Sequence, residues 1–298
     1  MKSLLISDYG FGSYSVKFLY RGVSVGEGDN EHRLVPSSKR KSVTDTYLPR
    51  GRKHFERDLI LFEPKVLASF FRHADSQGLP MPEIDSEIRR CLQSDEMRHD
   101  KRISLVSLRT GNFWPPDNLL PLTGQAQHYG IPTRLLDWSR DPLVSMYFAV
   151  EGAIKEEDKK KNHSSSEDNK IAVWVFDYDN FVLQSLKLHE SENHLKLVTA
   201  PASTNVNLRA QQGVFTLWRP PTINEGRKAI DTVSLDCTIN KIFGNDSGTY
   251  FFHKFTLPYS KLKELREKLR RVGVNTVKYF PDFRGASETV MQDLKEND

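Results

Sequence analysis

The sequence predicts an α+β protein, with most of its strands following its first helices. Two observations indicate this class. Apolar residues at helical spacing dominate the first half of the chain, whereas segments rich in β-branched and aromatic residues gather in the second half. This segregation of helices from strands is typical of α+β proteins.

The elements of the first half are predicted from periodicity and composition. A period of two indicates a strand, a spacing of three and four indicates a helix, and a polar stretch containing glycine indicates a loop. Pro64 lies inside the longer helix and is expected to break or kink it, because proline lacks the amide hydrogen of an internal helical bond. In chain order we predict a strand over 15–20, a long functional or mobile loop over about 23–53, and helices over 55–73 and 83–93.

The second half opens with a capped helix, because Asp141 is a good N-cap residue and Pro142 suits the first helical position. The charged run KEEDKKKNHSSSEDNK predicts a second mobile loop over 155–170. The remaining predictions are strands over 171–179, 213–218 and 249–258, and an amphipathic helix over 262–272 that ends at Gly273.

Bulk properties limit the setting and the partners. The chain of 298 residues has room for one large domain or two modest ones. Its net charge of +4 permits a polyanionic ligand without requiring one. Two cysteines make no metal spacing and no disulfide framework, which favours a reducing, cytoplasmic location. The opening MKSLLISDYG is too short and too polar for a signal peptide or a membrane span, so no membrane partner is expected.

Several common chemistries lack their motifs. The sequence contains no GxGxxG or GxxxxGK[ST] nucleotide loop, no HExxH or cysteine–histidine zinc spacing, and no GxSxG elbow. Carboxylates are scattered and do not cluster as a metal-dependent nuclease would require. We therefore expect no metal site.

The densest group of polar residues lies in QHYGIPTRLLDWSRDPLVSMYFAV (127–150), directly before an apolar helix. Burying so many donors and acceptors without a ligand or full mutual pairing would cost a few kcal/mol. The group therefore predicts the wall of a site, although Arg134 and Asp137 could instead form a buried ion pair at the strand-to-helix corner. Its members are His128, Tyr129, Thr133, Arg134, Asp137 and Ser139.

This stretch and four others resemble FRG-domain proteins, in the same order along the chain. The resemblance covers nearly all of the sequence, so one FRG-type domain is predicted over 1–298. The other four stretches are Tyr20-Arg21-Gly22, LVPSSKR (34–40), RAQQGVF (209–215) and YFPDFRGA (279–286).

A weaker resemblance is to the arginine-class ADP-ribosyltransferases, whose first strand ends in an aromatic residue, arginine and glycine. It implies an ADP-ribosyltransferase-like mixed or antiparallel sheet with flanking helices, and NAD as the substrate. Arg21 would hold the pyrophosphate through bidentate bonds, and Gly22 would allow close approach. In this reading Arg21, His128, Gln211 and Asp137 are the catalytic candidates, and Tyr20, Gly22, Tyr129, Thr133, Arg134 and Ser139 also bind the cofactor.

The second mark of that family, a strand bearing Ser or Thr before a helix, resembles Thr133 to Ser139 followed by 142–150, and the sequence departs from the family at the third mark. RAQQGVF carries Gln211 where a transferase has a glutamate, which stabilises positive charge as nicotinamide leaves. A glutamine can bind a ribose hydroxyl but cannot supply the charge. The acid would then come from Asp137, Glu151 or Glu288.

The resemblances imply an NAD-dependent ADP-ribosyltransferase or NAD glycohydrolase, acting as a toxin or phage-defence effector. Its partners would be a macromolecular acceptor (RNA, DNA or protein) and a cognate antitoxin or inhibitor. Two alternatives stay open. One is a non-enzymatic module that binds a nucleotide, a nucleic acid or a protein. The other is a ribonuclease-like toxin that uses His128 with Arg134.

Overall fold

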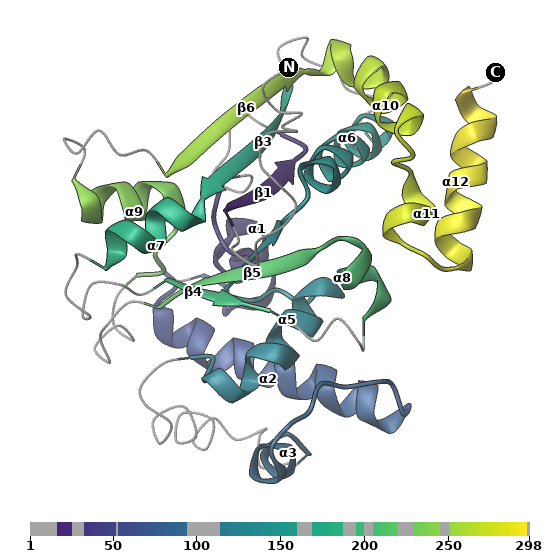
Figure 1. The fold of residues 1–298 in the computed structure, drawn as a ribbon. Helices are drawn as coiled ribbons and strands as arrows, with labels where there is room; N and C mark the ends of the chain where they lie inside the picture. The colour runs from purple at the N-terminus through teal and green to yellow at the C-terminus, as the bar shows by residue number, and fades with distance from the viewer. Residues whose placement is uncertain are drawn as a thin grey trace.

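The computed structural model describes residues 17–25, 33–51, 53–93, 114–159, 169–186, 195–199, 205–219, 229–244 and 251–296. It confirms the α+β class: helices flank a six-stranded antiparallel sheet (Figure 1). The strands are β1 (Phe18–Val23), β2 (Leu135–Ser139), β3 (Lys170–Asp177), β4 (Leu195–Val198), β5 (Gly213–Trp218) and β6 (Phe252–Pro258).

The described helices form an N-terminal group and a group that follows β2. The first contains η2 (Ser37–Lys39), α1 (Lys41–Tyr47), α2 (Glu56–Ser76), α3 (Ser86–Gln93), η4 (Asp117–Leu119) and α5 (Leu120–His128). The second contains α6 (Pro142–Lys159), α7 (Tyr178–Ser185), α8 (Val206–Ala210), α9 (Leu235–Phe243), η7 (Tyr259–Lys261), α10 (Leu262–Arg271), α11 (Thr276–Tyr279) and α12 (Phe283–Glu296).

The sheet is nearly divided at its centre. Its strand order is β4-β5-β2-β1-β3-β6. β1 follows β3 along its whole length, and β2 does the same with β5, but β1 and β2 are paired only at Tyr20 and Ser139. Past that pair the two strands separate, and side chains from both can enter the space between them.

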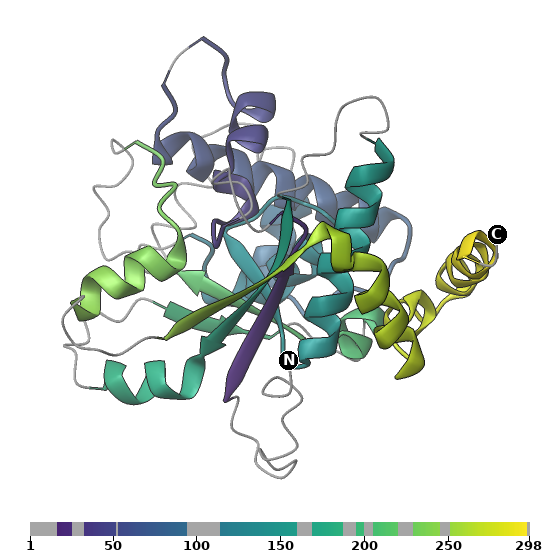
Figure 2. The ribbon, with the colours of Figure 1, turned by 90° about the horizontal axis from the view of Figure 1, so that it is seen from above.

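Opposite faces of the sheet carry different helices (Figure 2). On one face α6 and α10 form an apolar cluster in which Tyr147, Ile171 and Leu262 are buried. On the other, α7 and α9 cover an aromatic cluster around Trp138 and Phe176. Both faces of the central strands are therefore buried, which explains why IAVWVF reads as a continuous apolar run.

Helix α6 rests directly on β1. A Cβ atom at Gly22 would lie 1.8 Å from the backbone oxygen of Ser145, so only glycine allows this contact. The start of α6 follows the prediction: the Asp141 carboxylate accepts the amide hydrogen of Leu143 at 2.8 Å, and Pro142 is the first helical residue. The close approach that Gly22 permits is thus used by a helix.

Several predicted elements need correction. Helix α2 continues through Pro64, and the stretch predicted as a loop over 23–53 contains η2 and α1 in its described part. Of the second predicted loop, residues 155–159 belong to α6 and 170 to β3, while 160–168 lie outside the described residues. Nowhere in the described part of the chain is a helix long and apolar enough to cross a membrane.

Candidate functional site

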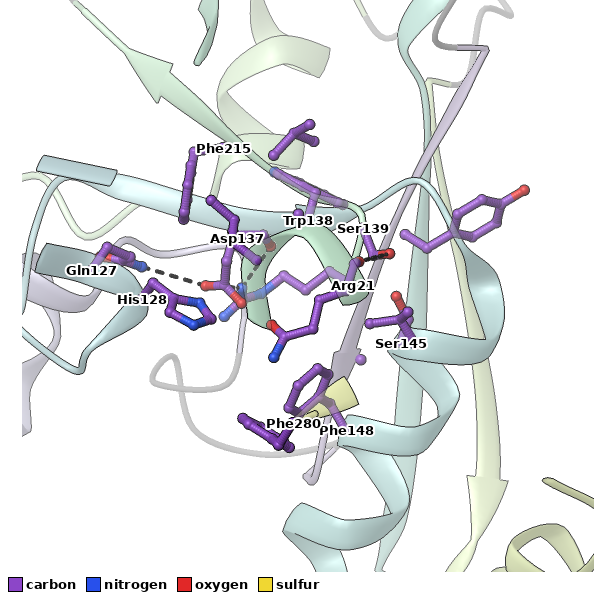
Figure 3. Close-up of a pocket in the computed structure, with 17 residues that line it drawn as sticks. Arg21, Gln127, His128, Asp137, Trp138, Ser139, Ser145, Phe148, Phe215 and Phe280 are labelled. Atoms are coloured by element: carbon purple, nitrogen blue, oxygen red, sulfur yellow. Dashed lines mark hydrogen bonds and ion pairs between the residues drawn. The ribbon is translucent and has the colours of Figure 1, made fainter. Parts of the chain in front are cut away.

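A cavity of about 260 Å³ opens where β1 and β2 separate (Figure 3). Its polar lining comes from β1, α5, β2, α6 and the turn between α8 and β5, and includes Arg21, Gln127, His128, Asp137, Ser139, Ser145 and Gln211. Its apolar lining includes Trp138, Val144, Phe148, Leu208, Phe215 and Phe280.

An ion pair spans the gap between the two strands. The Arg21 guanidinium donates from Nη1 to the backbone oxygen of Asp137 at 2.9 Å and contacts Oδ1 of the same residue at 2.5 Å. The Arg21 side chain is only 8% exposed, whereas that of Asp137 is 60% exposed. The arginine is therefore a buried bridge between the strands, and the carboxylate it holds is open to the cavity.

The surroundings of Asp137 keep it ionised. Loss of solvent raises the pKa of this carboxyl, but the adjacent Arg21 guanidinium outweighs it and, with a smaller contribution from Arg40, holds the pKa below its ordinary value. Among the described residues, both side-chain donors to the carboxylate (Arg21 and Gln127) contact Oδ1. A ligand can therefore approach a charged Oδ2.

Gln127 is oriented by a chain of hydrogen bonds behind the cavity wall. Its side-chain oxygen accepts the Thr133 hydroxyl at 2.5 Å and the Ser37 hydroxyl at 3.4 Å. This fixes the amide so that its nitrogen faces Asp137 Oδ1, at 3.4 Å. Thr133 thus acts on the site from behind, through Gln127.

His128 ends helix α5 and lies beside Asp137 (Figure 3). Burial lowers the pKa of the His128 imidazole, and the Asp137 charge opposes this shift without cancelling it. The ring is therefore neutral at pH 7, with one nitrogen able to accept a proton.

Two buried polar atoms of the lining have no hydrogen-bond partner among the described residues. They are the Ser145 hydroxyl and Nε of Arg21. A helical serine commonly bonds the carbonyl four residues earlier, but Ser145, only 2% exposed, makes no such bond. An unmade bond of this kind costs the free protein about 1–3 kcal/mol.

Gln211 is positioned by a turn. Gln211 caps the end of α8, Gln212 has a positive φ of 47°, and β5 begins at Gly213, where the strand was predicted to begin. The Gln211 side-chain nitrogen donates to the Tyr279 backbone oxygen at 3.2 Å. Its side-chain oxygen, which accepts no hydrogen bond within the described residues, is left for a ligand.

The four residues predicted as catalytic (Arg21, His128, Asp137 and Gln211) all line this one cavity, together with Tyr20, Gly22 and Ser139. Three predicted cofactor contacts do not line it. Tyr129 is largely exposed and meets only the edge of the His128 ring, with 5.3 Å between centroids, and Thr133 is buried behind Gln127. The third is Arg134.

The predicted ion pair between Arg134 and Asp137 is wrong. Arg134 instead contacts Glu63 at 2.5 Å and Glu56 at 3.3 Å, both on α2, because its side chain points away from the cavity into the space beneath that helix. Glu56 also binds Lys39 at 2.9 Å. We call Lys39, Glu56, Glu63 and Arg134 the sealed cluster.

Ten lining residues were not predicted as site residues, among them Gln127, Ser145, Phe148 and Phe280. The Phe148 and Phe280 rings pack edge to face, with centroids 6.0 Å apart, and form the apolar wall. Ser145 and Phe148 are one helical turn apart on α6, a spacing that could have signalled a shared face. Phe280 had no such signal, because it comes from a distant segment.

Comparison with known families finds a match for part of the chain. Residues 16–159 match the family model of the FRG domain. This chain contains an FRG domain. Neither the curated proteins nor the solved structures include a match to it.

The FRG domain supplies Arg21, His128, Asp137 and Ser145 to the cavity, whereas Gln211 and Phe280 come from beyond the matched residues. Two of the five stretches that carried the resemblance, 209–215 and 279–286, likewise lie beyond the match. No group of three or more His, Cys, Asp or Glu that could hold a metal occurs in the described part of the chain.

Proposed function

We propose that this FRG-domain protein binds NAD in the cavity, breaks the bond between nicotinamide and ribose, and transfers ADP-ribose to a macromolecular acceptor. The observation that carries the proposal is the placement of Asp137. Of the three acids that could replace the missing glutamate, Asp137 alone lines the cavity, while Glu151 pairs with Arg266 and Glu288 with Arg284.

The reaction gives each polar group a role. As the bond from ribose C1′ to nicotinamide breaks, the electron pair leaves with nicotinamide and positive charge develops on the ribose. Asp137 stabilises that charge across the cavity. The acceptor then attacks C1′, and its proton passes to neutral His128 as general base.

The remaining lining suits a nucleoside. The side-chain oxygen of Gln211 can accept a ribose hydroxyl, the Ser145 hydroxyl can bond a polar group on the base, and the wall of Phe148 and Phe280 can pack against a planar ring. Small-molecule sites occupy roughly 300–1,000 Å³, so a cavity of about 260 Å³ would hold the reacting nucleoside while the rest of NAD extends outside.

The layout of the cavity also supports a transferase. The three marks of the resemblance lie on neighbouring strands: the Tyr20-Arg21-Gly22 stretch on β1, Ser139 at the end of β2 and Gln211 just before β5. All three face the cavity. We assign Arg21 to holding Asp137, because its Nη1 already contacts that carboxylate. The phosphate role predicted for Arg21 would require Nε or Nη2.

In this proposal the protein acts in the cytoplasm as a toxin or phage-defence effector. A second candidate is a nucleotide-binding module without catalysis, which the Arg21 contact favours because it offsets part of the Asp137 charge. The ribonuclease alternative loses support, because Arg134 is sealed under α2 and cannot reach a phosphate in the cavity.

The test is to incubate the protein with NAD labelled in the adenylate and to measure nicotinamide release, label transfer and RNA integrity in one reaction. We expect release by the wild type and a loss of about 10²- to 10³-fold in Asp137→Asn. Asp117→Asn is the matched control, since the Asp117 side chain is similarly exposed at 61% and is likewise paired with an arginine, Arg219. Binding of NAD without release would support the module, and RNA cleavage without release would support the ribonuclease.

A further inference from the structure

Residues 33–57, which we call the basic segment, form one of two equally basic stretches of the chain, the other being 254–278. The basic segment contains eight lysines and arginines against two acidic residues, whereas the whole chain has 43 against 39. Outside the basic segment, acidic residues therefore outnumber basic ones by two. The function proposed above makes no use of this asymmetry.

Part of the basic segment is structural. Lys39 binds Glu56 in the sealed cluster, and Nε of Arg40 donates to the Val35 backbone oxygen at 3.1 Å. These two residues therefore anchor the segment to the body of the protein.

Other cations of the basic segment face solvent. Lys41, Arg50 and Arg57 are exposed, and within the part of the chain that the structure describes no carboxylate lies within 4.0 Å of their charged groups. Arg57 stacks over the Phe55 ring at 5.5 Å. The exposed acid of the segment, Asp45, is 4.0 Å from the His54 imidazole.

An exposed aromatic ring accompanies these cations. Tyr47, at the end of α1, is 61% exposed and stacks on Phe62 with centroids 5.8 Å apart and an interplanar angle of 24°. Cations that follow a phosphate backbone beside an aromatic face for stacking bases are the features of single-stranded nucleic-acid binding. A membrane fits less well, because the other exposed residues of α1 are polar: Lys41, Ser42, Asp45 and Thr46.

The basic segment adjoins the cavity. The Ser38 amide donates to the Thr133 backbone oxygen at 3.1 Å, and the Ser37 hydroxyl contacts Gln127, a lining residue. Arg40 is near enough to Asp137 to lower the pKa of that carboxyl. The start of the basic segment therefore packs against the wall of the cavity, near Asp137.

We propose that the exposed face of the basic segment docks single-stranded nucleic acid, and that the docked strand is the acceptor of ADP-ribose. The acceptor half rests on the proposed function; the docking half does not. In the transfer, a hydroxyl or amine of the strand bonds to ribose C1′, nicotinamide leaves with the electron pair of the broken bond, and the acceptor proton passes to His128.

The docking half is tested by fluorescence anisotropy with labelled 20-nucleotide RNA and DNA strands over a range of salt concentrations. We compare the wild type with the triple variant Lys41→Gln, Arg50→Gln, Arg57→Gln. The charge-matched control is Arg90→Gln, Lys241→Gln, Lys263→Gln, three exposed cations on α3, α9 and α10 that have no ion pair among the described residues.

For three lost phosphate contacts, the slope of log K against log salt should fall by about 2, and the affinity at 0.1 M salt by about 100-fold. The control triple should keep the wild-type slope. Equal losses in both triples would overturn the docking surface, because they would reflect net charge alone. A wild type that binds neither the RNA nor the DNA strand would also overturn the docking surface.

The acceptor half is read from labelled NAD in the presence of each strand and of a mixed protein substrate. Label on the strand, lost in the segment triple but kept in the control triple, is the expected result. Label on protein alone would overturn the acceptor assignment while leaving NAD cleavage intact. Strand binding without nicotinamide release would overturn the proposed function and leave the docking surface standing.

Discussion

Arg21 and Arg134 both form ion pairs near β2, but the two pairs have different surroundings. Arg21 reaches Asp137 at the edge of the cavity, where the carboxylate is open and two polar atoms of the lining lack partners. Arg134 sits in the sealed cluster, where its side chain and those of Glu56 and Glu63 are at most 10% exposed. The first pair exposes its carboxylate to the cavity, whereas the second is enclosed by protein.

The contrast shows what marks a site among buried charges. Ion pairing alone does not mark a site, because the sealed cluster contains more charges than the pair at the cavity. Burial raises the pKa of the Glu56 carboxyl, but Arg134 and Lys39 outweigh it and hold that pKa low, so this acid too is ionised. What distinguishes Asp137 is a charged oxygen that a ligand can reach.

The strongest test of the contrast is Arg134→Gln. Removing this cation leaves Glu56 and Glu63 buried with only Lys39 to compensate, and breaking such a cluster typically costs about 3–5 kcal/mol. We expect a loss of that size in the free energy of unfolding by urea, with unchanged nicotinamide release per folded molecule. Arg140→Gln, an exposed neighbour, should be neutral. A stable Arg134→Gln variant with lost activity would make Arg134 part of the site.

A second substitution, Ser145→Ala, should separate stability from activity. Alanine removes a buried hydroxyl that has no partner, so the free protein should be as stable as the wild type or more so. If the hydroxyl bonds the ligand, nicotinamide release should fall about tenfold, the effect of one lost hydrogen bond of up to about 1.5 kcal/mol. A melting temperature that drops together with activity would indicate a structural role instead.

Thr133 offers an isosteric comparison. Thr133→Val removes the hydroxyl that orients Gln127, whereas Thr133→Ser keeps it. We expect kcat to fall severalfold in the valine variant with little change in KM, because Gln127 then no longer holds Asp137 in one orientation. The serine variant should retain most of the activity. A loss in the serine variant with activity retained in the valine variant would show that the methyl group, and hence packing, is what matters.

The smallest expected effect is on stability against pH. Burial lowers the pKa of His128 in the folded protein, so the contribution of this group is complete above its unfolded pKa of about 6.5 and is lost as pH falls through its folded pKa. Unfolding free energies between pH 8 and 5 should therefore decline more in the wild type than in His128→Gln. If the wild type instead gained stability relative to the variant as the pH falls from 8 to 5, the Asp137 charge would outweigh burial and raise the pKa of the His128 imidazole.

Much of the fold followed from the sequence because its signals are local. The Asp141-Pro142 start of α6 and the β5 strand over 213–218 were predicted at their observed positions. Helix α2 was predicted to end or bend at Pro64 but continues, since packing of its buried face outweighs the lost hydrogen bond. The short α1 was missed because its polar sequence has no apolar period.

The site was predicted in part for the same reason. The dense polar stretch identified His128, Asp137 and Ser139, which lie close together in the sequence. The partners of Arg21 and Arg134 could not be assigned, because each ion pair joins segments more than 70 residues apart. The place of Phe280 in the cavity could not be predicted either, because this residue is far along the chain from the other lining residues.

The division of the sheet has a consequence for how the family should be studied. The matched residues include β1 and β2 alone among the described strands, and each is hydrogen-bonded along its outer side to a strand beyond residue 159. Expressed alone, the matched stretch would present two unsatisfied strand edges and an open pocket floor. We therefore expect that residues 16–159 alone would aggregate, and that a protein able to fold and bind a ligand must include the strands beyond residue 159.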